Sequence, residues 1–379
     1  MVTDDSNDAQ AQSSVSPNKS SDEIVAQVQL ASQRRYDIDW LRVIAIAILL
    51  VFHIMVMYQS YANHVRFIQS PTLLEGLLVP LSLSSVIRIP LLFFVSGMGV
   101  FFSLQRRNWI KLLGERTVRI LIPLVFGSFA IVPIHEFIYM KYYSANLAYE
   151  PGMGHLWFLA NIYMYVLWSL ALFYFVKEIQ NSRFLDVVRR LIEKYPFGVY
   201  LLATPYMLQS LTIPVDVPYS LFFDSRVGLL LGMIAFLLGF TIVALGEKAW
   251  KAISRIKYYS LCLALALYLN RLLMYDAHGP HILTSIESIS WIIAAFGLGY
   301  RYLNRPSKIL SYLSPAAYPV YIVHMVFLYI GAYYIFPLGL NPWVSLLLIT
   351  LFTFAGCFFS YEILRRIFFL RPLFGLKRK

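Results

Sequence analysis

Long runs of apolar residues alternate with short polar segments through almost the whole chain. No Asp, Glu, Lys or Arg occurs in the runs 43–65, 151–176, 195–215, 227–246 and 309–361. A helix needs about 20 mainly apolar residues to cross the roughly 30 Å hydrocarbon core of a bilayer. A backbone that faces lipid must satisfy its own hydrogen bonds, so the spans are expected to be helices. Ten spans fit the pattern, at 38–60, 83–105, 117–138, 155–177, 196–213, 224–246, 257–275, 283–303, 315–337 and 342–364.

Composition agrees with an all-α, polytopic membrane protein. Of 379 residues, 59% are hydrophobic, 16% aromatic and only 14% charged, whereas soluble domains carry roughly a quarter charged residues. A soluble nucleic-acid binder, a collagen, a coiled coil and a disulfide scaffold are therefore excluded. The two cysteines, Cys262 and Cys357, lie far apart inside apolar runs, which is typical of buried thiols rather than of a disulfide or a metal site.

The distribution of positive charge predicts the topology. Of the 32 Lys and Arg residues, 26 fall in one set of alternate polar segments, and only Arg66 and Lys141 fall in the other set. Cytoplasmic loops carry such an excess, so both termini are expected in the cytoplasm. The net charge of +12 is then a topology signal, and no nucleic-acid partner is expected.

Three segments are expected along the chain. Residues 1–33 are polar and rich in Ser, Asp, Gln and Asn, which predicts a disordered cytoplasmic tail that is not a cleaved signal peptide. Residues 34–370 form the transmembrane domain, and residues 371–379 form a basic cytoplasmic tail.

Four arginines remain within or at the edge of the predicted spans: Arg42, Arg88, Arg226 and Arg271. A central Arg costs about 2.5–3.5 kcal/mol on insertion scales, so it usually faces the bundle interior or a wet cavity. Snorkelling to the lipid headgroups is the alternative, and it suits Arg226 and Arg271 best because they lie near span ends.

Arg42 and His53 are expected to share a helix face. Ten apolar residues separate them, and eleven residues at about 100° each make close to three turns and about 16 Å of rise. Asp39 precedes Arg42 by three residues, close enough to orient it. A basic group near the cytoplasmic surface thus lines up with an imidazole near mid-membrane, although a histidine that only bonds two helices together is the alternative.

Five motifs in this order resemble those of the membrane-bound acyltransferase-3 family. The first span has Arg42, ten residues and His53, and the second reads RIPLLFFVSGMGVFF from Arg88 through Ser96. The later motifs are RTVRILIP with Arg116 and Arg119, HLWFL with His155 and Trp157, and YPVYIVH ending in His324. Within the family, the chain is most similar to members that succinylate osmoregulated periplasmic glucans, through HLWFL, the Glu287 context IESISWIIAAFGLG and YEILRRIFFLRPLFG.

This resemblance implies an integral O-acyltransferase of a bacterial inner membrane. It would move an acetyl or succinyl group from cytoplasmic acyl-CoA to a hydroxyl of an extracytoplasmic glycan or lipid-linked sugar. The acyl-CoA is a co-substrate, and no metal is expected. His53 is the expected general base, because imidazole titrates near neutral pH. Arg42 and Arg88 are expected to complete the catalytic set, with Arg88 or Ser96 donating to the developing oxyanion. A covalent acyl-histidine is an alternative to direct attack.

The remaining candidates are assigned to substrate binding. Arg116 and Arg119 suit the phosphates of CoA, although a purely topological role is the alternative. His155, Trp157 and His324 are candidates for contacts with the substrate. Glu287 is the last candidate, and a structural ion pair with Arg271 competes with that role.

Two transport functions are alternatives to an acyltransferase. A secondary transporter also places charges at mid-membrane, but its inverted repeats with paired broken helices are not found. A flippase-like carrier of glycan precursors would need no thioester chemistry. Release of the CoA thiol distinguishes both from an acyltransferase.

Overall fold

The computed structural model of the chain describes residues 34–105, 108–179, 182–214, 219, 225–275 and 279–377. The predicted tail 1–33 lies outside the described residues, as do the last two residues of the predicted segment 371–379. Within the described ranges the chain forms helices joined by turns and irregular segments, with no strand. The prediction of an all-α membrane protein is confirmed.

Seven long helices carry most of the fold. They are α2 (Tyr36–Val56), α3 (Leu78–Gln105), α12 (Arg226–Leu245), α13 (Glu247–Tyr275), α14 (His281–Tyr302), α15 (Lys308–Ile335) and α16 (Pro342–Leu364). An eighth long segment runs through α4 (Trp109–Arg116), α5 (Ile122–Phe126) and α6 (Val132–Tyr142), joined by the π-helical turns η3 (Thr117–Leu121) and η4 (Gly127–Ile131).

Shorter elements complete the chain. The short α-helices are α7 (Trp157–Trp168), α8 (Leu170–Ile179), α9 (Arg183–Lys194), α10 (Gly198–Leu202) and α11 (Thr204–Ser210). The 3₁₀ turns are η1 (Asn63–Val65), η2 (Glu75–Leu77), η5 (Gly154–Leu156), η6 (Phe336–Leu338) and η7 (Pro372–Phe374).

Eight helices among the described residues are long and apolar enough to cross a membrane. A ninth is obtained if Gly154–Trp168 and Leu170–Val176, which meet at 57°, form one broken span. The expected span at 196–213 is not one continuous helix. It divides at Ala203 into α10 and α11, with Pro205 in the first turn of α11, and proline cannot donate a backbone hydrogen bond to the preceding turn. The count of ten spans and the cytoplasmic termini stay predictions.

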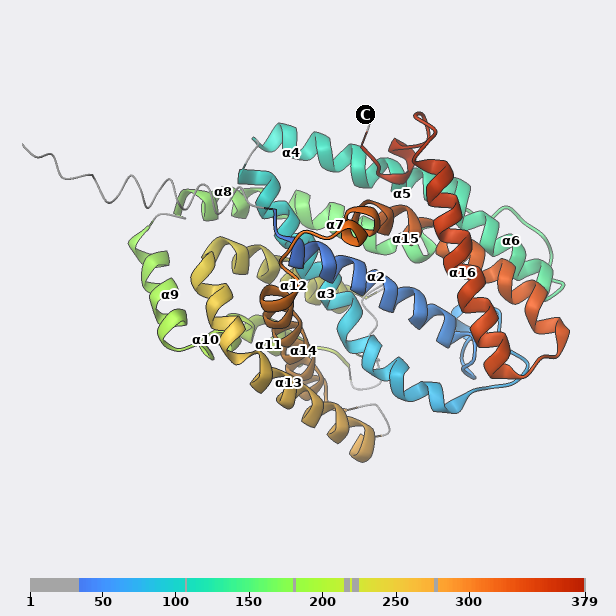
Figure 1. Cartoon of the computed structure of the whole chain (residues 1–379), viewed down its shortest axis with the longest axis horizontal. Coiled ribbons are helices and arrows are strands. Elements are labelled where there is room, and N and C mark those ends of the chain that lie inside the picture. Colours follow the sequence, from blue (N-terminus) through green and yellow to red (C-terminus); the bar gives the residue numbers. More distant parts are fainter. Residues whose placement is uncertain are drawn as a thin grey trace, which may run out of the picture. The chain divides into compact units, whose positions relative to one another are not determined.

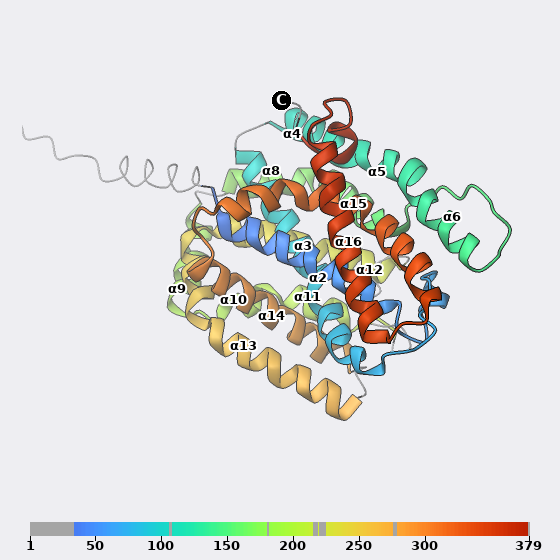
Figure 2. The same ribbon diagram turned by 45° about the vertical axis from the view of Figure 1, so that its right-hand side comes forward.

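Helices α2 and α3 lie side by side in the middle of the helical domain. Helix α3 packs against α2, α12 and α14, while α2 also contacts α15. Figures 1 and 2 show α13 and α6 at opposite edges of this arrangement. The two central helices therefore contact α12 and α14 as well as α15.

Helices α3 and α12 approach at two glycines. A Cβ built on Gly97 would overlap the carbonyl oxygen of Phe236, and a Cβ built on Gly239 would overlap that of Phe94. Small residues allow such close backbone contact between membrane helices, where dispersion forces and not water drive association. The Ser-Gly of the second-span motif thus has a packing role.

A proline inside α3 is compensated by a neighbouring helix. Pro90 has no N–H to donate to the carbonyl of Val86 one turn earlier. The hydroxyl of Ser288, on α14, donates to that carbonyl oxygen at 2.9 Å. Away from water, a freed backbone carbonyl needs such a partner. The proline lies on α3, and the hydroxyl that satisfies the carbonyl comes from α14.

Candidate functional site

His53 and His324 are hydrogen-bonded to each other. Nδ1 of His53, in the last turns of α2, lies 2.9 Å from Nε2 of His324 on α15. The two rings are stacked, with centroids 5.1 Å apart and planes 12° from parallel. His324 is fully buried and His53 is half-buried. Two candidates that lie 271 residues apart in sequence thus form one unit.

Two further histidines extend this pair into a histidine cluster, formed by His53, His324, His155 and His135. The ring of His155, on η5, meets that of His324 edge-on at 5.0 Å between centroids. The ring of His135, on α6, lies 5.5 Å from that of His155. The sequence identified three members of the histidine cluster as separate candidates. His135 was not a candidate in the sequence, because it lies near the end of a predicted span and shows no metal-ligand spacing.

The hydrogen bonds of the histidine cluster go largely to backbone carbonyls of α15. Nδ1 of His324 lies 2.6 Å from the carbonyl oxygen of Tyr321. Nε2 of His155 lies 3.0 Å from the carbonyl oxygen of Ile322. The hydroxyl of Tyr321 in turn donates to the carbonyl oxygen of His155. Helix α15 therefore fixes the orientation of both rings.

Arg88 lies beside this cluster, on α3. Its guanidinium carbon is 3.3 Å from the ring centroid of Phe52, the residue that precedes His53, so it makes a close cation–π contact. Its side chain is 7% exposed, and its Nε is buried with no hydrogen-bond partner among the described residues. The charge of Arg88 acts directly on the His53 ring. Arg88 and His53, which the sequence assigned to catalysis, are brought together.

Arg42 lies at the other end of α2, near the second half of α3. Its Nη1 donates to Oδ1 of Asp39 at 3.4 Å, which confirms the predicted contact. Its Nη2 lies 3.9 Å from where a Cβ of Gly99 would be. Arg116 donates from Nη2 to the carbonyl oxygen of Gly99 at 3.0 Å. Two arginines that lie 74 positions apart in the printed sequence therefore converge on one residue of α3.

Arg119 and Tyr318 adjoin the same region. Arg119 pairs with Oε1 of Glu115 at 3.2 Å. The hydroxyl of Tyr318 is buried without a hydrogen-bond partner among the described residues, and both Arg116 and Arg119 act on it electrostatically. We call Arg42, Arg116 and Arg119 the basic cluster. Planar guanidinium groups suit phosphate oxygens.

Ser96 and Trp157 are placed less directly. The hydroxyl of Ser96 donates to the carbonyl oxygen of Leu92 in its own helix at 2.7 Å, so that hydrogen is committed to the backbone. The ring of Trp157, at the start of α7, packs against those of Phe93 and Phe158. Of the two candidate oxyanion donors, the geometry favours Arg88 over Ser96.

Glu287 and Arg271 form the ion pair that the sequence suggested. Nε and Nη2 of Arg271 donate to the two carboxylate oxygens at 2.7 and 2.9 Å, and Nη2 also donates to the carbonyl oxygen of Ser82. Both residues are at most 4% exposed. The pair ties α13, α14 and α3 together, and its hydrogen bonds engage both carboxylate oxygens.

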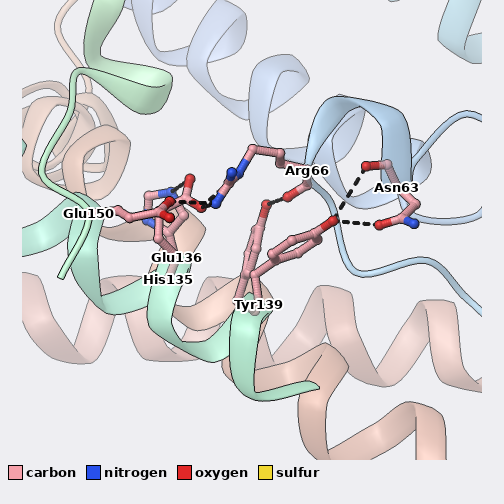
Figure 3. A network of polar contacts seen from close by, with 7 residues as sticks. Asn63, Arg66, His135, Glu136, Tyr139 and Glu150 are labelled. Atoms are coloured by element: carbon pink, nitrogen blue, oxygen red, sulfur yellow. Dashed lines mark hydrogen bonds and ion pairs between the residues drawn. The ribbon is translucent and has the colours of Figure 1, made fainter. Parts of the chain in front are cut away.

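A network of polar contacts lies beyond the His53 end of α2, and Figure 3 shows its residues. Nη2 of Arg66 lies 2.7 Å from Glu136 on α6 and 2.7 Å from Glu150 in the following segment. The hydroxyl of Tyr329 on α15 donates to the backbone carbonyl of Arg66, and Nε2 of His135 lies 3.7 Å from Glu136. We call Arg66, Glu136 and Glu150 the outer ion-pair network.

The outer ion-pair network adjoins the histidine cluster. Phe67 follows Arg66, and its ring centroid lies 5.7 Å from that of His53. Partial burial works against the charge of Arg66, but hydrogen bonds and attraction from Glu136 and Glu150 raise its pKa above the ordinary value. Sequence reasoning missed Arg66, Glu136 and Glu150 as a group. Two signals were present in the sequence: Arg66 is one of only two basic residues in its set of polar segments, and Glu136 is an acidic residue near the end of an apolar span.

Metal binding has no support in the described part of the chain. No group of three or more His, Cys, Asp or Glu side chains there has the arrangement of a metal site. The nitrogens of His53, His324 and His155 for which a hydrogen bond is found bond to one another or to backbone carbonyls.

Comparisons with known proteins point to one family. The acyltransferase-3 family model, described as an acyltransferase domain, matches residues 35–362. The chain is 24% identical over 380 residues to the glucans biosynthesis protein C of Escherichia coli strain K12, covering 91% of this chain and 95% of that protein. The same protein of strain O157:H7 EC4115 is 24% identical over 377 residues, with the same shares covered. No solved structure matches the chain significantly.

Proposed function

Because the chain belongs to the acyltransferase-3 family and is a membrane acyltransferase, we propose that it moves an acyl group from acyl-CoA to a hydroxyl of a glycan or lipid-linked sugar. The observation that carries this proposal is the convergence of His53 from α2, His324 from α15 and Arg88 from α3. A base beside a buried hydrogen-bond donor suits attack of an alcohol on a thioester.

His53 acts as general base. It accepts the proton of the acceptor hydroxyl while the oxygen attacks the thioester carbonyl. The C–S bond then breaks, and the same proton passes to the departing thiolate, so acyl transfer needs no net proton uptake. Removing the proton as the C–O bond forms spares the alcohol from ionising before it attacks.

Arg88 stabilises the tetrahedral intermediate. Negative charge develops on the former carbonyl oxygen, and a buried guanidinium meets that charge where little water competes. The Nε hydrogen of Arg88, which has no partner among the described residues, supports this role. A donor already committed elsewhere would first have to give up a hydrogen bond.

The basic cluster binds the phosphates of CoA. Arg42 and His53 are eleven residues apart on α2, about 16 Å along the axis. A pantetheine arm has a comparable length, so phosphates held by Arg42, Arg116 and Arg119 leave the thioester within reach of His53. The positive-inside pattern supports a cytoplasmic position for this end of α2, where acyl-CoA is available.

The acceptor reaches the histidine cluster from the opposite side, past the outer ion-pair network. The E. coli relatives are named for glucans biosynthesis, which supports a glucan as acceptor. Acetyl-CoA and succinyl-CoA are the donors we propose, with the chain in a bacterial inner membrane and both termini cytoplasmic. His155 and Trp157 are the candidates that we propose for contacts with the acceptor.

Release of the CoA thiol tests the proposal. Purified protein in lipid nanodiscs is given acetyl-CoA or succinyl-CoA, with and without glucan, and free thiol and acylated glucan are both measured. We expect thiol release that depends on the glucan. His53→Ala should lower this rate by at least about 10²-fold, because general base assistance is typically worth 10²–10⁴-fold, while acyl-CoA binding survives.

Two controls make the result decisive. His53→Ala combined with Ile54→His moves the imidazole about 100° around the helix and should not restore transfer. Transfer by His53→Ala at the rate of the unaltered protein, at matched protein level, would contradict the role of His53. Folded protein that binds the glucan and releases no thiol with either donor would favour a carrier instead.

A further inference from the structure

The bond between His53 and His324 has a direction that follows from its neighbours. A carbonyl oxygen can only accept a hydrogen bond. Nδ1 of His324 lies 2.6 Å from the carbonyl oxygen of Tyr321, so Nδ1 must carry the hydrogen and donate it. This leaves Nε2 of His324 as the nitrogen that faces His53.

His324 is neutral in this setting. Its side chain is fully buried, and none of the ion pairs found among the described residues involves it. The charged or titratable groups that face the pair are Arg88 from α3, His135 from α6, His155 from η5 and Tyr321 from α15, none of them a carboxylate. An imidazolium would therefore be a buried cation without a counter-ion. In the neutral ring with a hydrogen on Nδ1, Nε2 is bare and can only accept.

His53 must then supply the hydrogen of the bond at 2.9 Å. Its Nδ1 donates to Nε2 of His324, and a neutral ring protonated on Nδ1 has a bare Nε2. Which nitrogen of a histidine is protonated is set by the hydrogen bond that the other nitrogen makes. The chain of bonds from Tyr321 O through His324 to His53 thus exposes the lone pair of one nitrogen.

We propose that His324 is a positioning residue that holds His53 in the tautomer whose Nε2 accepts the hydroxyl proton. The inference rests on the proposed function for the identity of the base. In the reaction, the O–H proton moves to Nε2 as the C–O bond forms and returns to the thiolate sulfur as the C–S bond breaks. His324 touches no reacting atom and keeps accepting from Nδ1 when His53 becomes charged.

His155 does not compete for this role. Its Nε2 lies 3.0 Å from the carbonyl oxygen of Ile322, so that nitrogen carries the hydrogen. Its Nδ1 is buried and without a hydrogen-bond partner among the described residues. Because its contact with His324 is edge-on between rings, His155 packs against the relay and does not lengthen it.

Nuclear magnetic resonance of ring nitrogens tests the tautomer without reference to activity. The full-length protein, labelled with ¹⁵N-histidine and reconstituted in nanodiscs, is compared with His53→Gln to assign the His53 signals. We expect Nδ1 of His53 to be protonated and Nε2 bare. In His324→Ala the two tautomers should mix. A protein whose His53 carries its hydrogen on Nε2 overturns the proposal.

Two amide variants test the positioning. The side-chain oxygen of Gln can reach the position of Nε2 and accept from His53, whereas that of Asn falls short. We expect His324→Asn to lower kcat at least about 10-fold with the KM for acyl-CoA unchanged, and His324→Gln to stay within a few-fold of the original kcat. Replacing the residue that orients a catalytic histidine, so that the wrong tautomer results, costs far more in serine proteases, about 10⁴-fold.

The outcomes separate the two proposals. Equal kcat values in folded Gln and Asn variants would overturn the positioning role of His324. Full activity in His53→Ala would overturn His53 as the base, while the tautomer would still be read from the spectrum.

Discussion

Two buried arginines illustrate how the same residue type serves different ends. Arg271 meets both oxygens of Glu287 and a backbone carbonyl, so its charge is neutralised within the bundle. Arg88 is similarly buried, yet it contacts an aromatic ring and leaves Nε without a hydrogen-bond partner among the described residues. A charge that is costly to bury and only partly compensated indicates a functional role.

Replacing Arg88 should impair catalysis more than binding. Arg88→Met keeps most of the side-chain length and removes every donor, so we expect kcat to fall about 10²–10³-fold, the loss typical of one oxyanion donor. Arg88→Lys keeps the charge but loses the planar fork and should retain part of the activity. Steady-state kinetics with glucan and acyl-CoA measures this.

The control for Arg88 is Arg226→Met, which removes an exposed arginine at the start of α12. It should leave kcat within a few-fold. If Arg88→Met, folded and inserted, turned over as fast as this control, Arg88 would have no part in the chemistry.

At the scale of elements, the π-helical turn η3 sets the direction of side chains in the basic cluster. It carries Arg119 and directly follows Arg116. A π turn adds a residue to the helical turn and shifts the side chains that follow it, and such turns are frequent at functional sites. The hydrogen bond from Arg116 to Gly99 then brings this segment against α3.

Removing both arginines should weaken acyl-CoA binding. We expect Arg116→Ala with Arg119→Ala to lower the affinity for acyl-CoA at least about 10-fold while the protein stays inserted, because charge-assisted bonds to phosphate are lost. Isothermal titration in nanodiscs measures the affinity. Lys377→Ala, which removes a terminal charge, is the matched control. Unchanged affinity in the double variant would confine these arginines to topology.

The contact of α3 with α12 depends on its glycines. Gly97→Ala inserts a methyl group where the carbonyl oxygen of Phe236 already lies, so the helices must move apart. Overpacking of this kind typically costs about 1–3 kcal/mol, and we expect a clearly lower melting temperature in detergent. Gly114→Ala is the control, because nothing lies within 4 Å of its added Cβ. Equal melting temperatures for the two variants would argue against the close approach.

At the scale of the whole molecule, charge is separated between the two ends of the central helices. The basic cluster lies at the Arg42 end of α2, and the outer ion-pair network, with two carboxylates for one arginine, lies beyond the His53 end. This difference in charge would favour a donor rich in phosphate at the basic cluster and an acceptor rich in hydroxyls at the outer ion-pair network. His53, the proposed general base, lies between them.

Reporter fusions test the orientation that this arrangement requires. A reporter active only outside the cytoplasm should be silent after Lys379 and active when inserted within 139–153, because Lys and Arg accumulate on the cytoplasmic side. A second reporter that is active only in the cytoplasm should give the reverse pattern. A strong external signal at the C-terminus would contradict cytoplasmic termini.

Sequence alone determined the features that are local or that follow from lipid as solvent. Apolar runs gave helices, since no other open structure satisfies its backbone in a bilayer. Spacing along a helix gave the contact of Asp39 with Arg42, and the scarcity of buried charges gave the pairing of Glu287 with Arg271. The motifs around His53 and Arg88 pointed to the family that the chain belongs to.

Only the tertiary structure decided which distant residues meet. Nothing in local spacing could place His324 against His53, 271 positions earlier, since that contact depends on how α15 packs against α2. The bond from His324 to the carbonyl of Tyr321, three residues earlier, is local to α15, so it is the packing of α15 against α2 that passes its effect to the tautomer of His53. The hydropathy pattern also predicted one helix at 196–213, where the chain forms two, because proline divides an apolar run without making it less apolar.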